Sequence, residues 1–340
     1  MFITEIQAIS PQNTYTNKGI YPIVVHNGNR YFAIEPNYSG IIPPNQLRRM
    51  GKSLRMGIGA AMPIVTKHSD IQGIILGSAD GGLEDCIKFL NQIVLYNEGT
   101  LSPTGFVQST PNAVAGNIAS MTKNSSHNCT HVHGGHAFEN ALLDAFLLAE
   151  TQQVEKILVG NIDEISDFNY SIEMQGNWFK SEETNNTTLL ESNTPGTVCG
   201  ESACMFLLQS HALHYYAQIC DIDIFSFPES NELEQRFHAF LQKNAITTQS
   251  ISRVYLGYNG DSRYDFQYKK IETLCSYASN IHTFKNLVGE HPTSIAFAVY
   301  LASLELHGIQ PTHIPCYTLI YNQYKNKQHT FILLQGKNSA

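Results

Sequence analysis

The chain has 340 residues, and its 21 basic and 29 acidic side chains give a formal net charge of −8. Such a charge argues against a nucleic-acid partner, which needs a basic face. A hydrophobic content of 42% allows a large buried core, whereas no apolar run reaches the roughly eighteen residues of a membrane span. No charged and then apolar leader opens the chain, so we expect a cytoplasmic protein without membrane contact.

Strands that alternate with helices are predicted along the first part of the chain. Residues 1–6 and 73–77 read as strands, and the second is followed by a glycine-rich turn. Residues 128–138 read as a buried strand that turns sharply into a helix, and residues 139–150 extend that helix with apolar side chains at helical spacing. The next predicted strand covers residues 156–160.

The second part of the chain follows a polar stretch, residues 167–193, which we expect to be a loop or insertion. A strand at 200–208 closes the first half. The later elements are a helix at 211–217, a strand at 222–227, a helix at 232–244, a strand at 252–257, a helix at 294–307 and strands at 317–321 and 329–334 that can form a hairpin. This order favours an α/β layered fold with helices between sheets.

The cysteines give no sign of a disulfide framework. There are seven, an odd number, and no two form a close pair motif. In a chain of this size without a leader, we expect buried free thiols.

Five segments in the right order resemble the β-ketoacyl synthases of the thiolase superfamily. They are the strand, cysteine and glycine turn at 128–138, the strand and glycine turn at 73–82, the segment 102–119, the strand 200–208 and the lysine loop 285–294 with its apolar helix. The resemblance implies a thiolase-like layered αβαβα fold with two pseudo-symmetric halves, residues 1–208 and 209–340.

The catalytic positions that the resemblance implies do not carry the family's residues. The nucleophilic cysteine of the family falls on His131, although Cys129 lies only two residues earlier. The first family histidine is replaced by Asn259, which can donate a hydrogen bond but cannot exchange a proton near neutral pH.

Later family signatures are also altered. Lys285 keeps the place of the family's lysine, whereas the second histidine is replaced by Glu290, with His291 one residue further on. The family's Gly-Phe-Gly-Gly loop appears as Tyr324 to Lys327, and four larger residues do not reproduce the close backbone approach of glycines. A condensing enzyme needs a thiolate, oxyanion donors and two imidazoles together, so we expect no condensation at this site.

The function implied is that of a chain-length-factor type of protein, a non-condensing partner of an active synthase in fatty-acid or polyketide biosynthesis. Acyl carrier protein and an active synthase subunit are the expected partners, as a heterodimer or otherwise a homodimer, and no cofactor is expected. The histidine pattern at 131–133 also resembles synthase homologues of aryl-polyene and flexirubin-type pigment pathways. Two alternatives stay open: a divergent acyltransferase that uses Cys129 or a His131 general base, and a homodimer that binds acyl thioesters.

The same segment also offers metal ligands, because His127, Cys129, His131 and His133 alternate and share one face of a strand. Alternate residues of a strand lie about 7 Å apart, which is too far for one ion without a ligand from elsewhere. Neutral buried histidines bonded to the backbone are therefore the better interpretation, and no metal is predicted.

One basic cluster, residues 48–55, has two interpretations. A solvated helix face is the simpler one. The resemblance favours, as the alternative, a dock for an acidic acyl carrier protein or a subunit contact.

Overall fold

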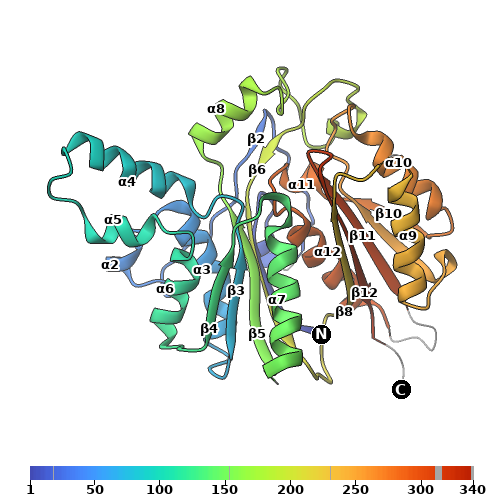
Figure 1. Cartoon of the computed structure of the whole chain (residues 1–340), viewed down its shortest axis with the longest axis horizontal. Coiled ribbons are helices and arrows are strands. Elements are labelled where there is room, and N and C mark those ends of the chain that lie inside the picture. Colours follow the sequence, from blue (N-terminus) through green and yellow to red (C-terminus); the bar gives the residue numbers. More distant parts are fainter. Residues whose placement is uncertain (18, 153, 230, 311–315, 338–340) are drawn as a thin grey trace.

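The computed structural model describes residues 1–17, 19–152, 154–229, 231–310 and 316–337. Ten strands form one large sheet, whose order is β10-β9-β11-β12-β8-β1-β7-β5-β3-β4 (Figure 1). The strands of this sheet are β1 Phe2–Ile9, β3 Gly73–Gly77, β4 His127–His131, β5 Lys156–Asp163, β7 Ser202–Gln209, β8 Ala217–Ser226, β9 Ile251–Leu256, β10 Asn280–Thr283, β11 Tyr317–Tyr324 and β12 Gln328–Gln335. A small second sheet pairs β2 Arg30–Tyr31 with β6 Cys199–Gly200.

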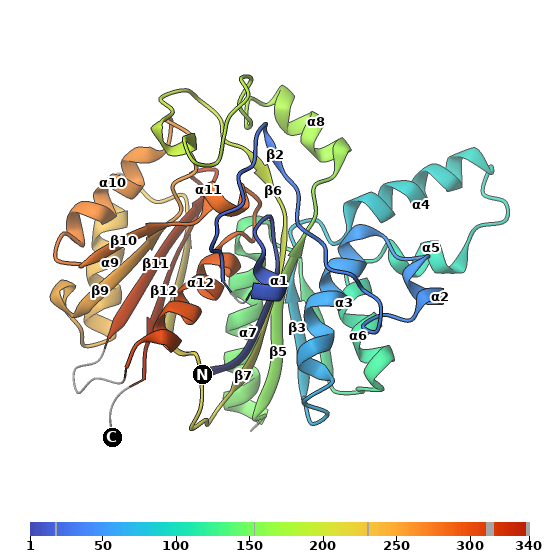
Figure 2. The ribbon, with the colours of Figure 1, turned by 180° about the vertical axis from the view of Figure 1, so that it is seen from behind.

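Helices cover the sheet and pack inside its curve (Figures 1 and 2). They are α1 Thr14–Asn17, α2 Pro44–Leu47, α3 Lys52–Val65, α4 Leu83–Leu95, α5 Pro103–Gln108, α6 Ala113–Thr122, α7 Ala137–Gln152, α8 Asp167–Gln175, α9 Glu232–Lys243, α10 Asp265–Leu274, α11 Lys285–Val288 and α12 Ile295–Gly308, with short 3-10 turns at Gly134–His136, Leu189–Glu191 and Thr248–Ser250. No helix of the described residues is long and apolar enough to cross a membrane.

The strand order repeats itself on the two sides of the β1–β8 seam. From the seam outward, β1, β7, β5, β3 and β4 pair as antiparallel, antiparallel, parallel and parallel, and β8, β12, β11, β9 and β10 pair in the same sequence. The early strands thus lie on one side and the late strands on the other. The chain boundary between residues 208 and 209 itself stays a prediction.

The largest core lies between the two sets of strands. Helices α7 and α12 contribute to one buried cluster together with β1, β5, β7, β8, β11 and β12. All residues of α12 from Ile295 to Ser303 are buried, as expected for a helix that is apolar around its whole circumference. The strands β3 and β5 are buried along almost their whole length because both of their faces are covered.

Most predicted elements are present, but three expectations were wrong. Residues 167–193 contain helix α8 rather than only loop. Residues 211–216 are not helical. Leu213 is 92% exposed, so a helix here would have no apolar side chain to pack against the core. The Tyr216 N–H instead donates to the Ile3 carbonyl and extends the pairing between β8 and β1. Strand β4 is an edge strand of the sheet and only half-buried.

The basic cluster at 48–55 is not one helix face. Arg48 and Arg49 lie in the turn between α2 and α3, and only the later residues belong to α3. The Arg55 guanidinium donates to both carboxylate oxygens of Glu35, at 3.1 and 3.0 Å.

Candidate active site

A pocket of about 800 Å³, including its open mouth, lies where parallel strands of both sides of the sheet end. Ser78 follows β3, Asp163 ends β5, Asn259 follows β9 and Tyr324 ends β11, and all four line the pocket. Open α/β sheets bind their ligands at such carboxyl ends. Helix α8 and Trp178 form part of its wall.

Three of the residues singled out by the sequence meet at the floor of this pocket, where Asn259 and Glu290 line it and Lys285 lies behind them. Glu290 Oε2 accepts a hydrogen bond from Asn259 Nδ2 at 2.6 Å and from the ammonium of Lys285 at 2.9 Å. Lys285 also donates to the Gln323 carbonyl at 2.9 Å and is fully buried. Burial lowers the pKa of Lys285 and raises the pKa of Glu290, and the attraction between them opposes both shifts. The result is a closed, neutralised group.

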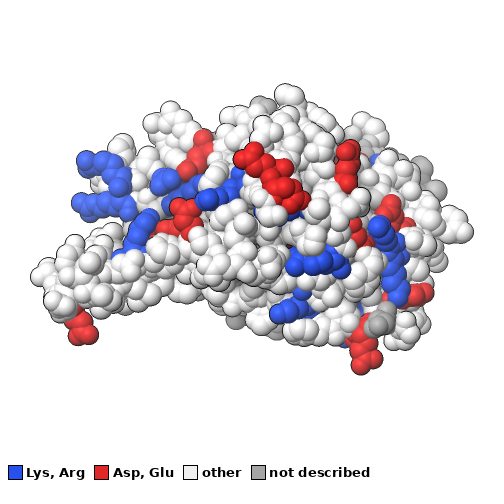
Figure 3. Space-filling model, turned by 90° about the horizontal axis from the view of Figure 1, so that it is seen from above, with Lys and Arg blue, Asp and Glu red and all other residues white. Residues whose placement is uncertain are grey.

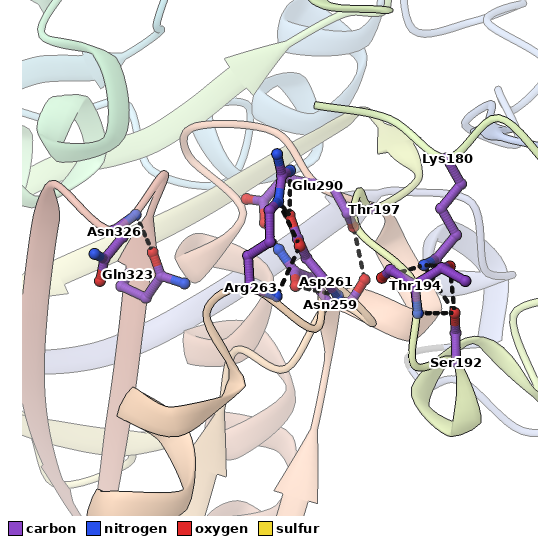
Figure 4. Close-up of polar contacts among 10 residues, drawn as sticks. All are labelled: Lys180, Ser192, Thr194, Thr197, Asn259, Asp261, Arg263, Glu290, Gln323 and Asn326. Carbon is purple, nitrogen blue, oxygen red and sulfur yellow. Dashed lines mark hydrogen bonds and ion pairs between the residues drawn. The ribbon is translucent and has the colours of Figure 1, made fainter. Parts of the chain in front are cut away.

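The backbone around this group is held by close packing and side-chain contacts (Figure 4). Gly289 has a φ of +77°, and a Cβ at Gly200 would lie 2.0 Å from the Val288 carbonyl oxygen, so only glycines allow this approach. Thr197 donates to the Asn259 carbonyl at 2.7 Å. These contacts fix Asn259 beside Glu290.

Further contacts hold the surrounding loops in the same view (Figure 4). Asp261 forms an ion pair with Arg263 at 2.6 Å, and the Lys180 ammonium bonds the hydroxyls of Ser192 and Thr194 at 2.8 and 2.9 Å. The Gln323 side-chain oxygen accepts from the Asn326 N–H at 2.5 Å, which closes the β11–β12 turn.

His291 lines the pocket beside Glu290 but is already engaged. Its Nε2 lies 2.8 Å from the Ser202 hydroxyl. Burial, followed by the neighbouring Lys285, lowers the pKa of His291 to about 3, so the imidazole is neutral at physiological pH.

A second carboxyl group of the wall is buried and has a raised pKa. Burial raises the pKa of Asp163 to about 7, while hydrogen bonds from Thr293 and from the Ala79 N–H oppose that shift. This residue was not predicted as a site residue. Its signal in the sequence is an acidic side chain at the end of a largely apolar strand.

Cys129 and His131 lie outside this pocket. Both point from β4 toward helix α7, where His131 Nε2 approaches Asp144 Oδ2 at 3.0 Å, and neither lines the pocket. Burial, and then the charge of Asp144, raises the pKa of Cys129, which works against a thiolate.

The thiol that does line the pocket is Cys199, which the sequence analysis did not single out as a site residue. It is 9% exposed. Burial, with a smaller contribution from Glu201, raises the pKa of the Cys199 thiol well above its usual range. The pocket wall formed by the described residues therefore holds no activated thiol.

The N-terminal turn before α7 is blocked by the β11–β12 hairpin. The Gly135 N–H donates to the side-chain oxygen of Gln328 at 2.8 Å, and the Gln328 amide donates to the His133 carbonyl at 3.2 Å. A Cβ at Gly135 would lie 2.4 Å from the Cβ of Tyr324. The turn of the β11–β12 hairpin thus packs directly on the strand-to-helix turn at residues 132–136, called the elbow below, and occupies a backbone donor there.

The histidines of the elbow do not share one environment. His136 is buried and contacts the His329 carbonyl at 3.2 Å, as predicted for a neutral histidine bonded to the backbone. Burial lowers the pKa of His136 to about 4. The prediction was wrong for His127 and His131, which are partly exposed and approach the carboxylate of Asp144.

Comparison with known proteins supports the resemblance seen in the sequence. Residues 30–184 match the family described as β-ketoacyl synthase, N-terminal domain. No curated protein sequence matches the chain.

Solved structures share the fold along nearly the whole chain. The ishigamide ketosynthase/chain length factor has a TM-score of 0.74 at 15% identity, covering 99% of both chains. The ketosynthase ApeO in complex with its chain length factor ApeC from Xenorhabdus doucetiae gives 0.73 at 13%, covering 98% of this chain and 97% of that one. A β-ketoacyl synthase from Burkholderia phymatum gives 0.75 at 13%, covering 98% of each. The predicted thiolase-like α/β fold is confirmed, and the family match supports the resemblance to β-ketoacyl synthases over residues 30–184.

Proposed function

We propose that this ketosynthase-like chain is a non-condensing subunit, which pairs with an active β-ketoacyl synthase in fatty-acid or polyketide biosynthesis, as a chain length factor does. The observation that carries the proposal is the buried group of Asn259, Lys285 and Glu290. Within this class, the elbow pattern favours the aryl-polyene or flexirubin-type pigment pathways.

The chemistry of condensation explains why this group argues against turnover. Decarboxylation of a malonyl unit requires donors that stabilise a developing enolate. Asn259 directs one amide N–H at Glu290, and the Lys285 ammonium is paired with the same carboxylate. In this arrangement neither residue replaces the imidazole pair of a condensing enzyme.

A partner surface is available on the arm formed by α4 and α5, which projects from the body (Figures 1 and 2). Val94 and Leu95 are each 75% exposed, and Phe106 is 58% exposed. The arm, at the left of Figure 3, shows mainly uncharged side chains. Contiguous exposed apolar side chains are typical of protein interfaces, and this arm precedes the segment that leads into the elbow.

A dock for acyl carrier protein is proposed at Arg48 and Arg49. Both are exposed and lie beside the root of the arm, where they line a groove together with Lys88. An acidic carrier protein is attracted to such a group through long-range electrostatics.

Co-expression with an active synthase of the same pathway tests the pairing. We expect a stable 1:1 complex on size-exclusion chromatography, lost in the double variant Val94→Asp/Leu95→Asp because two charges enter an apolar interface. Leu213→Asp is the matched control, since Leu213 is 92% exposed and lies away from the arm. A chain that stays a homodimer in the presence of every candidate synthase contradicts the proposal.

A second candidate function is the binding of an acyl thioester without turnover. Glu290 Oε1 and His291 Nδ1 are buried and without a hydrogen-bond partner among the described residues, and both residues line the pocket. Calorimetric titration with an acyl-pantetheine amide, which cannot transfer its acyl group, tests this candidate. Tight binding by the homodimer alone favours it over the partner role.

A further inference from the structure

We propose that Cys129, His131 and Asp144, together with His127, form a Zn²⁺ site between the edge strand β4 and helix α7. The site lies outside the pocket, and its residues take no part in the proposed pairing function. Its occupant is a divalent transition-metal ion that prefers nitrogen, sulfur and carboxylate ligands.

The ligand atoms already converge. Cys129 Sγ, a ring nitrogen of His131 and a carboxylate oxygen of Asp144 all lie within 4.8 Å of one another. A tetrahedral zinc ion places neighbouring ligand atoms roughly 3.3–3.6 Å apart, given its usual bond lengths. Closing these three atoms around an ion therefore needs side-chain movements of about an ångström.

His127 lies outside that close group of three and is the proposed fourth ligand, which reaches the ion by a rotation of its side chain. Its Nε2 lies 3.6 Å from Asp144 Oδ2, the same oxygen that His131 Nε2 approaches at 3.0 Å. His127 and His131 are four residues apart on one strand, which corresponds to about 13 Å along its axis. Both rings therefore lean toward Asp144 from opposite sides, with Cys129 between them.

Asp144 is the ligand from another element that the spacing of the strand residues requires. Alternate residues of a strand are too far apart to share an ion by themselves. Helix α7 packs against β4 and carries Asp144 to the middle of the row, so the ligand from elsewhere is present.

The two faces of β4 differ in how their polar groups are satisfied. On the α6 face, Asn128 donates to the Ala115 carbonyl at 3.0 Å, and Thr130 donates to the Asn112 side chain at 2.7 Å. On the α7 face, two imidazoles and a thiol gather around one carboxylate. On the α7 face, the single carboxylate of Asp144 therefore faces three potential metal ligands of β4.

The donor set suits zinc best. Sulfur and imidazole nitrogen are the usual zinc ligands, and a carboxylate commonly completes the set. A thiolate and a carboxylate also neutralise the two positive charges of the ion. Such a site would tie the free edge of the sheet to α7 and stabilise the elbow, because structural zinc binding contributes directly to folding free energy.

Metal titration of the tag-free full-length protein tests the proposal. After chelator treatment and dialysis, we expect one Zn²⁺ per chain in competition with a chromophoric chelator. Co²⁺ should give a thiolate charge-transfer band in the near ultraviolet. In Cys129→Ser and Asp144→Asn, affinity should fall by more than the roughly 10–100-fold that loss of an outer-shell partner costs.

Matched controls separate this site from adventitious binding. Cys86→Ser removes another partly exposed thiol, and His238→Ala removes a histidine that approaches Glu234 at 3.9 Å, so both should retain full affinity. If a variant that lacks a ligand does not fold, alkylation of the wild-type protein tests the site without any substitution. Zn²⁺ should then protect Cys129, but not Cys86, from iodoacetamide. Substoichiometric binding, equal binding by all variants or unchanged alkylation of Cys129 overturns the proposal.

Discussion

Two clusters of ionisable side chains, the pocket floor and the outer face of β4, differ in how completely their groups are paired. On the floor, Lys285 and Glu290 are buried and satisfy one another with Asn259. On β4, Cys129 and His131 are partly exposed and share a single carboxylate. The residues that the sequence marks as reactive thus lie away from the pocket, while the pocket holds charges that cancel. A nucleophilic or ionisable residue therefore indicates a catalytic site only when it lies in a pocket and is not already paired with its neighbours.

The largest expected effect comes from opening the paired cluster. Glu290→Gln leaves the buried Lys285 without its counter-ion, so we expect a loss of about 3–5 kcal/mol in the free energy of unfolding, measured by urea denaturation. Asp70→Asn breaks the exposed pair with Lys156 and should cost at most about 1 kcal/mol. Equal losses in the two variants would show that the floor is not a tightly coupled ion pair.

The open cluster should respond to an added ion where the paired one does not. If the zinc site exists, Zn²⁺ at about 100 times its dissociation constant should raise the free energy of unfolding by about 2.7 kcal/mol, measured in the same denaturation experiment. The gain should vanish in Cys129→Ser and persist in Glu290→Gln. A gain lost in Glu290→Gln instead would place the ion at the pocket floor.

Packing between the hairpin and the elbow can be tested with a single methyl group. Gly135→Ala would place a Cβ 2.4 Å from that of Tyr324, so we expect a loss of about 1–3 kcal/mol from overpacking. Gly116→Ala, in the interior of α6, meets nothing within 4 Å and should gain up to about 1 kcal/mol, because alanine favours the helix. Thermal unfolding of both variants against wild type measures the difference, and a tolerated Gly135→Ala would mean that the hairpin does not press on the elbow.

The smallest effect is a pH slope caused by a buried carboxyl group on α7. Burial raises the pKa of Glu139 to about 8, and its carboxyl accepts from Thr330 at 2.8 Å. The unfolded state releases this proton at lower pH than the folded state, so stability falls as pH rises from about 4.5 to about 8. Buried histidines act in the opposite direction, but the contribution of His291 and His136 fades as pH rises above about 6.5, because the unfolded imidazoles then lose their protons as well.

Between pH 6.5 and 7.5, Glu139→Gln should therefore reduce the negative slope by up to about 1.4 kcal/mol per pH unit. Urea denaturation at several pH values gives that slope. Glu150→Gln, at the exposed end of the same helix, is the control for loss of a carboxyl group. An unchanged slope in Glu139→Gln would show that this carboxyl is ionised in the folded protein.

Much of the fold was readable from the sequence because its strongest elements carry one-dimensional signals. The apolar segments of α12, β3 and β5 need both faces covered, and their length and residue types predict a long helix in one case and short strands in the others. The non-helical conformation of residues 211–216 could not be predicted. It depends on whether Leu213 packs against the rest of the protein, and in the fold Leu213 is exposed.

The candidate site was predictable where the family resemblance fixed positions, as for Asn259, Lys285 and Glu290. The meeting of Asp144 with the histidines of β4 was not predictable. Alternation places Cys129 and His131 on one face, but the residue that faces them depends on the rotation of α7, which is set by packing across the whole core. The pocket position of Cys199 has the same origin, because it lies beside Glu290 only after β6 and the α11 loop have packed together.

The measurement that tests the central claim most directly is the intact mass of the protein after incubation with acyl- and malonyl-carrier protein. Wild type, Cys129→Ala and Cys199→Ala should be compared under identical conditions. The non-condensing account predicts no acyl adduct in any of them. An adduct on the wild type that disappears in either cysteine variant would contradict the account and identify the nucleophile.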